Sequence, residues 1–239
     1  MADHIKTAFI TGGSKGIGFG VAEVLIQQGI KVAITSRSQQ AADEAAAKLN
    51  QIKDGYAIGM ASDVRDLASQ QRVVETILQQ WGRLDYVIAN AGVGHFAPIQ
   101  ELTPEQWRDT IDINLTGVFN TTKATIAALK ETEGYFISIA SLAGTNFFEN
   151  GSAYNASKFG LVGFTQAIML DLRKEGIKVS TIMPGSVATE FADHTLGDAD
   201  AWKIQPEDIG NIVYDLLKMH PRTLPSKVEV RPTIPGGKK

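Results

Sequence analysis

Short apolar runs alternate with longer amphipathic segments along almost the whole chain. Compact apolar runs bounded by turn residues are typical of buried strands, whereas apolar positions that recur about every 3.6 residues predict helices. The pattern predicts strands at Ile5–Thr11, Lys31–Thr35, Tyr56–Met60, Leu84–Ala89, Tyr135–Ala140, Lys178–Met183 and Lys227–Val230. It predicts helices at Ile17–Gln28, Gln39–Gln51, Asp66–Gln80, Pro104–Glu131, Ser152–Glu175 and Pro206–Met219.

The alternating order of these strands and helices indicates an α/β fold. Parallel strands need crossover connections, and the crossover helices cover both faces of the sheet. The prediction is therefore a Rossmann-like, doubly wound parallel sheet of about seven strands. We expect one domain over residues 1–239, because no linker or repeat divides the chain. The longest irregular stretch, Pro184–Gln205, is expected to be a lid or binding loop.

Composition narrows the functional class. The 239 residues are 44% hydrophobic and 21% charged with a net charge of −3, so the charge balance gives no indication of a nucleic-acid partner. The sequence contains no cysteine, which excludes disulfides, thiolate nucleophiles and thiolate metal sites. The first residues lack the pattern of a signal peptide, and no apolar run is long enough to predict a membrane span. We therefore expect a cytoplasmic protein without a membrane partner.

A glycine-rich turn, TGGSKGIG, follows the first predicted strand and opens the first predicted helix. Glycine permits backbone angles closed to other residues and lets the main chain approach a phosphate, while the helix N-terminus offers N–H groups. A turn at this position predicts a dinucleotide site, with a plain tight turn as the structural alternative. The residues of the predicted site are Gly12, Ser14, Lys15, Gly16, Ile17 and Gly18.

The end of the second strand indicates which dinucleotide is bound. An acidic residue there selects NAD, whereas a nearby arginine accommodates the 2′-phosphate of NADP. The strand runs into Ser36 and Arg37 without a carboxylate, and Lys15 adds a second cation. We therefore expect NADP(H) as the cofactor. The alternative is that both cations are solvated surface charges.

A tyrosine and a lysine share one face of the predicted helix Ser152–Glu175. Tyr154 and Lys158 are one helical turn apart, a spacing that brings side chains together. Ser141 follows the fifth strand, at the carboxyl edge where open α/β sheets bind ligands. A phenol, an ammonium and a hydroxyl are therefore candidates for one site.

In this order and spacing, the motifs resemble the short-chain dehydrogenase/reductase family over nearly the whole chain. The residues that carry the resemblance are Thr11–Gly18, Asp63, Asn90, Ala91, Gly92, Asn114, Ser141, Tyr154, Lys158, Pro184, Gly185 and Thr189. One departure is Ala89, where many members have a second asparagine; little consequence is expected, because the backbone there is the functional part. The resemblance implies an NADP(H)-dependent oxidoreductase that reduces an aldehyde or ketone, or oxidises the alcohol.

The resemblance also implies roles for individual residues. Tyr154 would be the general acid/base, and Lys158 would lower its pKa and hold the nicotinamide ribose. Ser141 would orient the substrate oxygen. Asn114 would hold a helix irregularity and a water that relays protons to Lys158. Further cofactor contacts would come from Asp63, Val64, Asn90, Ala91, Gly92, Pro184, Gly185, Val187 and Thr189.

Apolar and aromatic side chains dominate the three loops predicted to surround the nicotinamide. These loops follow strands four, five and six and carry Val93, His95, Phe96, Leu142, Phe147, Phe148, Val187, Phe191 and Trp202. Because no arginine occurs in these stretches, we expect a small, neutral, partly hydrophobic carbonyl substrate. As alternatives, His95 is a solvent-exposed bystander and Phe147 and Phe148 are core residues. No metal site is expected.

Two other functions stay open at this point. A catalytically silent NADP(H)-binding regulator or scaffold is one, although such a protein need not keep all four catalytic residues together. A 3-oxoacyl-[acyl-carrier-protein] reductase is the other. Those enzymes usually end with a Gly-Gly-rich last strand, whereas this chain continues as VEVRP.

Self-association is expected as well. The segment Ala156–Leu170 is apolar almost all round, so it must be buried on more than one side. The resemblance implies that this helix and Pro104–Glu131 pair with their copies across a two-fold axis. We expect at least a homodimer. A homotetramer stays open, because the family's second interface uses the C-terminal segment, and Arg231–Lys239 is rich in proline, glycine and basic residues.

Overall fold

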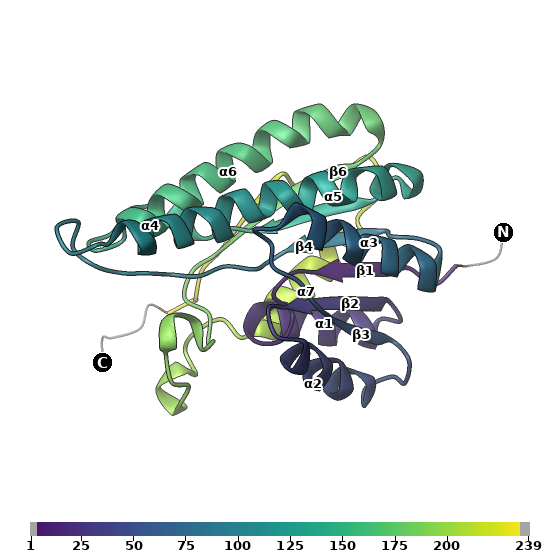
Figure 1. Cartoon of the computed structure of the whole chain (residues 1–239), viewed down its shortest axis with the longest axis horizontal. Coiled ribbons are helices and arrows are strands. Elements are labelled where there is room, and N and C mark those ends of the chain that lie inside the picture. The colour runs from purple at the N-terminus through teal and green to yellow at the C-terminus, as the bar shows by residue number, and fades with distance from the viewer. Residues whose placement is uncertain (1–3, 235–239) are drawn as a thin grey trace.

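The computed structural model describes residues 4–234, which fold around a parallel sheet of seven strands (Figure 1). The strands are β1 (Thr7–Ile10), β2 (Lys31–Ser36), β3 (Ala57–Ala61), β4 (Tyr86–Ala89), β5 (Tyr135–Ile139), β6 (Lys178–Pro184) and β7 (Lys227–Val230). Their order in the sheet is β3-β2-β1-β4-β5-β6-β7, and every neighbouring pair is parallel. The predicted fold class is confirmed.

Helices cover both faces of the sheet (Figure 1). One face carries α1 (Gly16–Gln27), α2 (Gln39–Asn50) and α7 (Pro206–Lys218), and the other carries α3 (Leu67–Trp81), α5 (Gly117–Thr132) and α6 (Ser152–Leu172). Ala8 and Ile10 of β1 belong to the core under α1 and α7, whereas Phe9 belongs to the core under α5 and α6. Successive strand residues point to opposite faces, so a strand covered on both sides is apolar throughout.

The direction of winding reverses at β1, which lies between β2 and β4. The chain leaves β1 through α1 toward β2 and β3, and then returns through α3 to β4 on the other side of β1. The loops that follow β1 and β4 therefore diverge and leave a crevice, where open α/β sheets bind ligands. This topology sets the glycine turn beside the loop after β4.

The helix predicted at Pro104–Glu131 is interrupted. The helix α4 (Pro104–Ile111) is followed by a π-helical segment, η1 (Asp112–Thr116), and only then by α5. The Gly117 N–H donates to the Asp112 carbonyl, the hydrogen bond of a π-helix. The helix irregularity that the family resemblance implied therefore lies at η1. Hydrophobic spacing alone predicts one continuous helix, because a single π turn changes the spacing by only one residue.

The loop Pro184–Gln205 is folded, and its two ends meet. A parallel bridge joins Val187 to Ile204, and the Ala188 N–H donates to the Ile204 carbonyl at 2.8 Å. Two short 3-10 turns, Phe191–Asp193 and Asp198–Asp200, lie between these ends. In Figure 1 this light green loop lies at the lower left, on the side of the molecule where the loops after β4 and β5 also project.

Asp85 anchors the amino-terminal edge of the sheet. Its side chain is 2% exposed and accepts hydrogen bonds from Lys6 Nζ at 3.0 Å, the Thr7 N–H at 3.0 Å and Arg83 Nε at 2.8 Å. Burial raises the pKa of Asp85, but these hydrogen bonds outweigh it, so the pKa lies below its ordinary value. This edge is opposite to the one that carries the crevice.

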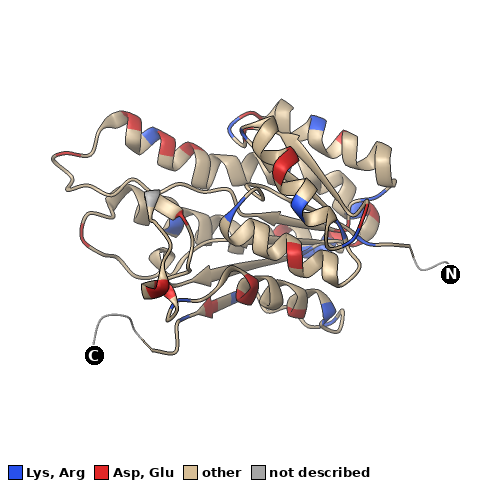
Figure 2. Ribbon diagram, turned by 90° about the horizontal axis from the view of Figure 1, so that it is seen from below, with Lys and Arg blue, Asp and Glu red and all other residues tan. Residues whose placement is uncertain are grey.

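Figure 2 shows Lys, Arg, Asp and Glu mainly on the helices and loops around the sheet. Between residues 4 and 234, none of the helices combines the length and apolar character needed to cross a bilayer.

The helix predicted at Ser152–Glu175 ends three residues early as α6, because Arg173–Glu175 forms a 3-10 turn. Of the C-terminal segment Arg231–Lys239, residues 235–239 lie outside the described residues.

Candidate active site

A cavity of about 490 Å³ lies at the carboxyl edge of the sheet. Most residues predicted from the sequence line it: Gly12, Ser14, Lys15, Gly16, Ile17, Ser36, Arg37, Asp63, Val64, Asn90, Ala91, Gly92, Val93, Ser141, Tyr154, Lys158, Pro184, Gly185, Val187, Thr189 and Phe191. Other predicted residues are not part of its wall: Gly18, His95, Phe96, Asn114, Leu142, Phe147, Phe148 and Trp202. The loops after β1, β2, β3, β4, β5 and β6 all contribute to it.

Main-chain geometry shapes the glycine turn. Gly12 and Gly16 have φ angles of 64° and 58°, in the left-handed region that glycine tolerates best. Gly18 has a packing role behind the turn. A Cβ at Gly18 would lie 2.5 Å from Asn90 Nδ2 and 2.7 Å from the Gly12 carbonyl oxygen, so only glycine lets α1 start this close to the turn.

Asn90 and Thr11 fasten the turn to the loop after β4. Asn90 Nδ2 donates to the carbonyls of Thr11 and Gly12 at 3.0 and 3.1 Å. The Thr11 hydroxyl accepts from the N–H groups of Asn90 and Ala91 at 3.0 and 3.1 Å. The Asn90 side chain is therefore a brace between the two loops.

The lining of this end of the cavity fits a nicotinamide dinucleotide. Among the described residues no side chain caps the N-terminus of α1, and its first turn contains no acidic residue, so its N–H groups suit a phosphate. Thr35, at the end of β2, has a buried hydroxyl with no hydrogen-bond partner between residues 4 and 234, and it lines the cavity. Because a buried polar group without a partner costs free energy, a bound ligand that pairs with it is favoured.

The two cations predicted to select NADP differ in their surroundings. Arg37 is exposed and lines the cavity just after β2. Lys15 Nζ lies 3.3 Å from Glu190 Oε2 of the loop Pro184–Gln205. Both side chains of that pair are more than half exposed, so the pair is weak and leaves Lys15 able to turn toward a phosphate.

Tyr154, Lys158 and Ser141 meet in the cavity wall. Lys158 Nζ lies 5.6 Å from the centroid of the Tyr154 ring, one turn earlier on α6. Lys158 is 4% exposed, and its Nζ donates to the Ile139 carbonyl at 3.1 Å. Ser141, just after β5, lines the same wall, and its Oγ accepts a hydrogen bond from the Ala143 N–H at 3.1 Å.

Burial dominates the titration of both groups. It raises the pKa of Tyr154 to about 12, and the Ser141 hydroxyl only partly opposes this shift. It lowers the pKa of Lys158 to about 8. The lowering of the Tyr154 pKa by Lys158, which the resemblance implied, is not found here, because burial is the largest influence and penalises the charged form of each group.

Asn114 of η1 is fully buried and lies behind the catalytic pair. Its Oδ1 accepts from the Val93 N–H at 2.8 Å, and its Nδ2 donates to the Val93 carbonyl at 2.9 Å and to Ser157 Oγ at 3.0 Å. Ser157 donates in turn to the Tyr154 carbonyl at 2.8 Å. Asn114 therefore clamps the loop after β4 to the start of α6. Its participation in a water relay stays a prediction.

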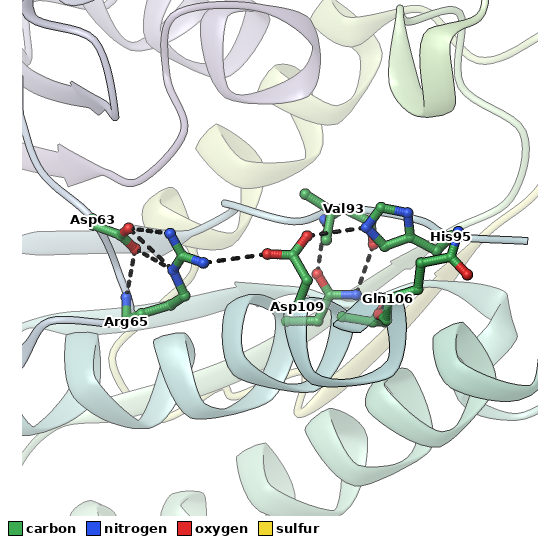
Figure 3. Close-up of polar contacts among 8 residues, drawn as sticks. Asp63, Arg65, Val93, His95, Gln106 and Asp109 are labelled. Carbon is green, nitrogen blue, oxygen red and sulfur yellow. Dashed lines mark hydrogen bonds and ion pairs between the residues drawn. The ribbon is translucent and has the colours of Figure 1, made fainter. Parts of the chain in front are cut away.

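Four side chains form a row from Asp63 to His95 (Figure 3). Arg65 binds Asp63 through Nε and Nη2 at 3.0 and 2.6 Å, and it reaches Asp109 of α4 through Nη1 at 3.3 Å. Asp109 also pairs with His95 Nε2 at 3.0 Å. The hydrogen bonds from Arg65 lower the pKa of Asp63. His95 thus points to α4, which differs from the expectation that it faces the substrate.

Three phenylalanines surround the Tyr154 ring. The ring centroids of Phe96, Phe191 and Phe148 lie 5.4, 5.6 and 6.5 Å from that of Tyr154. Phe191 lines the cavity, whereas Phe96 and Phe148 contact Tyr154 outside its wall. Phe147 is 86% exposed and Phe148 is 48% exposed, so neither is a core residue.

The sequence reasoning missed two side chains of the cavity wall, His194 and Lys203. Both bind Asp200, a carboxylate only 9% exposed, with Lys203 Nζ at 2.6 Å and His194 Nε2 at 2.9 Å. These hydrogen bonds lower the pKa of Asp200. Lys203 is a lysine in a loop without arginine, and its spacing from Asp200 is a signal in the sequence for an ion pair. Because Asp200 is its counter-ion, Lys203 adds no net positive charge.

The fold and this site define an oxidoreductase with a dinucleotide-binding crevice. Residues 6–199 match the family model described as short chain dehydrogenase. The chain therefore belongs to the short-chain dehydrogenase/reductase family, which confirms the resemblance noted in the sequence.

Known proteins of this type are similar over most of the chain. An uncharacterized oxidoreductase of Staphylococcus saprophyticus is 32% identical, covering 95% of this chain and 97% of the relative. A 3-oxoacyl-[acyl-carrier-protein] reductase of Synechocystis is 33% identical over 79% of this chain and 77% of its own. The structure of an alcohol dehydrogenase from Thermococcus sibiricus, complexed with 5-hydroxy-NADP, matches with a TM-score of 0.90 at 27% identity, covering 99% of this chain and 100% of that one.

Proposed function

We propose that this oxidoreductase uses NADP(H) to reduce a small, neutral, partly hydrophobic aldehyde or ketone, or to oxidise the corresponding alcohol. One observation carries the proposal: Tyr154, Ser141 and Lys158 line the same cavity as the glycine turn. Backbone suited to phosphate and side chains suited to proton transfer therefore share one space.

The proton is handled by Tyr154 and Ser141. A nicotinamide dinucleotide, when bound, supplies or accepts the hydride. The Ser141 hydroxyl hydrogen-bonds the substrate oxygen and keeps it beside the phenol. With a pKa of about 12, Tyr154 is protonated at neutral pH and donates its proton to that oxygen as the alcohol forms. In the oxidative direction the phenolate takes the proton back.

Lys158 supplies positive charge next to the phenol. Its pKa of about 8 leaves it mostly charged at neutral pH. A cation there stabilises the phenolate that remains after proton transfer. The Ile139 carbonyl holds the ammonium in place, and Asn114 acts as a positioning residue, because it joins the loop after β4 to α6.

The preference for NADP(H) over NAD(H) rests on Arg37 and Lys15. A guanidinium can bind a phosphate through two parallel hydrogen bonds, and the end of β2 offers no carboxylate to a ribose hydroxyl. The similarity to the Thermococcus alcohol dehydrogenase complexed with 5-hydroxy-NADP supports the same choice.

A neutral substrate is supported by the walls next to Tyr154. Val93, Val187 and Phe191 are apolar, and the positive charge of Lys203 is matched by Asp200. A substrate carboxylate would meet no unmatched cation there except Lys158, which the Tyr154 phenolate needs.

A 3-oxoacyl-[acyl-carrier-protein] reductase is the second candidate, and the Synechocystis relative is the observation that favours it. Turnover of acyl thioesters distinguishes this candidate from a reductase of small neutral carbonyl compounds. A catalytically silent NADP(H)-binding regulator is the third, and turnover of any carbonyl compound would eliminate it.

We also propose a homodimer through α5 and α6. Phe119, Phe159 and Leu170 on these helices are 46%, 44% and 50% exposed, which leaves apolar area for a second copy of the chain. Light scattering at micromolar concentration should give at least twice the mass of one chain, and the mass of one chain would contradict the proposal.

The proposed reaction is tested with a panel of aldehydes, ketones and acyl thioesters, by following NADPH and NADH absorbance. We expect NADPH to be preferred, and Arg37→Asp to shift the preference toward NADH, because a carboxylate repels the 2′-phosphate. We also expect a neutral keto ester to be a better substrate than its free acid. Equal rates with NADH, or a tenfold preference for the acid, would contradict the corresponding part of the proposal.

A further inference from the structure

We propose that the substrate carries an aromatic ring, which Phe96, Phe148 and Phe191 hold beside Tyr154. This inference rests on the proposed carbonyl reduction and adds a chemical class of substrate to it. Phe96 is the specificity-determining residue at the centre of the cluster.

Each of the three rings comes from a different loop. Phe96 follows β4, Phe148 follows β5, and Phe191 belongs to the loop Pro184–Gln205 after β6. The centroid of Phe96 lies 5.8 Å from that of Phe148 and 6.3 Å from that of Phe191. The rings meet Tyr154 at interplanar angles of 54° to 68°, the tilted and edge-to-face geometry that aromatic pairs prefer. Loops that are remote in the sequence thus converge on the catalytic phenol with the same kind of side chain.

The rest of the protein covers only part of each of the three phenylalanine rings. Phe96, Phe148 and Phe191 are 45%, 48% and 37% exposed, and the tyrosine that they surround is itself only partly exposed. Exposed apolar area that adjoins a catalytic group is typical of a binding pocket. A flat ring attached to the reacting carbonyl would cover these faces.

Two glycines make the approach of the rings possible. A Cβ at Gly94 would lie 2.7 Å from Phe191 Cζ and 2.8 Å from Phe96 Cζ, and a Cβ at Gly151 would lie 2.6 Å from Phe148 Cε2. The main chain itself therefore packs against the ring edges. The Ala97 N–H donates to the Asn150 carbonyl at 3.1 Å, which ties the loop of Phe96 to that of Phe148. The backbone of these loops therefore determines where the three rings lie.

The geometry favours an aromatic ring in the substrate over a saturated ring of equal size. An aromatic ring gains edge-to-face contacts with its neighbours beyond the apolar area that it buries, whereas a saturated ring gains the area alone. A cationic guest is also attracted by ring faces, but Lys158 lies 5.6 Å from the Tyr154 ring and repels a second positive charge.

The test compares phenylacetone with cyclohexylacetone. In both, a methylene separates the ring from the carbonyl, so the two ketones differ in aromaticity and hardly in intrinsic reactivity. We expect kcat/KM of the wild-type protein to favour phenylacetone by about tenfold, since each aromatic contact contributes roughly 2- to 10-fold. Phe96→Leu and Phe191→Leu should each bring the ratio toward one, and Gly94→Ala should do the same by displacing both rings. Phe147→Leu, a change in the exposed neighbour of Phe148, should leave the ratio unchanged.

A wild-type ratio near one, or a ratio that Phe96→Leu leaves unchanged, would overturn the inference. Higher kcat/KM for a ketone with a quaternary ammonium group would overturn it in favour of a cation site. Failure of the proposed reaction gives a different result: no ketone is turned over with either nucleotide. Calorimetry with the inert pair benzyl methyl ether and cyclohexylmethyl methyl ether then decides. Tighter binding of the aryl ether that Phe96→Leu abolishes supports the ring site, and equal affinities reject it.

Discussion

At the cofactor end of the cavity, the glycine turn is held by main-chain geometry and partly buried hydrogen bonds, whereas at the substrate end the loops around Tyr154 carry half-exposed rings and an exposed ion pair. Asn90 and Thr11 make four hydrogen bonds across the crevice with partly buried atoms. His95 pairs instead with Asp109 at the surface, where both side chains are about a third exposed.

The two ends of the cavity therefore differ in how much change of sequence they tolerate. Buried hydrogen bonds that lose a partner leave an unsatisfied group and cost free energy, so the cofactor end tolerates little change. Exposed ion pairs contribute little to stability, so the substrate end is free to vary its side chains and with them its specificity. Substitutions at the junction of the two ends and within each end should therefore differ in their effects.

The largest effect is expected for Tyr154→Phe. The change removes the proton donor and leaves both ends of the cavity in place, so kcat should fall by roughly 10²–10⁴-fold while the affinity for NADPH is retained. Stopped-flow or steady-state rates and a fluorescence titration measure the two quantities. Tyr56→Phe, remote from the cavity, is the matched control. Retention of more than about a tenth of kcat would mean that another group donates the proton.

The pH profile of ketone reduction should follow Lys158. A lysine is charged below its pKa, which burial lowers to about 8, whereas Tyr154 keeps its proton up to about 12. The rate should therefore fall as pH rises through about 8, by about tenfold per pH unit well above it. Lys158→Arg stays charged, so its profile, at whatever rate remains, should be flat to higher pH. A wild-type profile that is flat to pH 10 would sink this assignment.

Gly18→Ala probes the rigid cofactor end. The new Cβ would meet Asn90 Nδ2 at 2.5 Å and the Gly12 carbonyl at 2.7 Å, so the turn must shift. Overpacking of this kind typically lowers the free energy of unfolding by about 1–3 kcal/mol, which urea denaturation measures. The affinity for NADPH should fall as well. Gly163→Ala is the control in α6, because a Cβ there meets no atom within 4 Å and alanine is the better helix former. If both variants unfold alike, the turn tolerates an added methyl group as well as α6 does, and it is not rigid.

Asp109→Ala probes the adjustable substrate end, and its effect should be the smallest. It removes the partner of His95 and one partner of Arg65, while the Arg65–Asp63 pair remains. We expect KM for the ketone to rise a few-fold, with stability changed by less than about 1 kcal/mol because the pairs are exposed. KM for NADPH should stay constant. A large loss of stability would contradict the contrast between the two ends.

Features with a local signal could be predicted from the sequence. The glycine turn, the Tyr154–Lys158 spacing and the apolar strands each lie within a few residues of one another, so short-range rules identify them. Membership of the family follows from the same motifs. The doubly wound parallel sheet also follows, because strand–helix alternation allows few topologies.

Features that depend on distant partners could not be predicted. The orientation of His95 is decided by Asp109 on another element. The pKa of Tyr154 depends on burial, which three loops create together. The exposure of Phe147 and the contact of Phe96 with Tyr154 likewise depend on how those loops converge.

The π-helical segment η1 has a consequence for changes in chain length. A π turn holds one residue more than an α turn over about the same rotation, so deleting one residue from Asp112–Thr116 would give a continuous α-helix and leave α5 facing as it does now. Asn120 would keep its hydrogen bond to the Val64 carbonyl, whereas Asn114 would lose the wide turn that directs it to Val93 and Ser157. The extra residue therefore serves the site and not the packing of α5, and an engineer who grafts a new α4 must keep it.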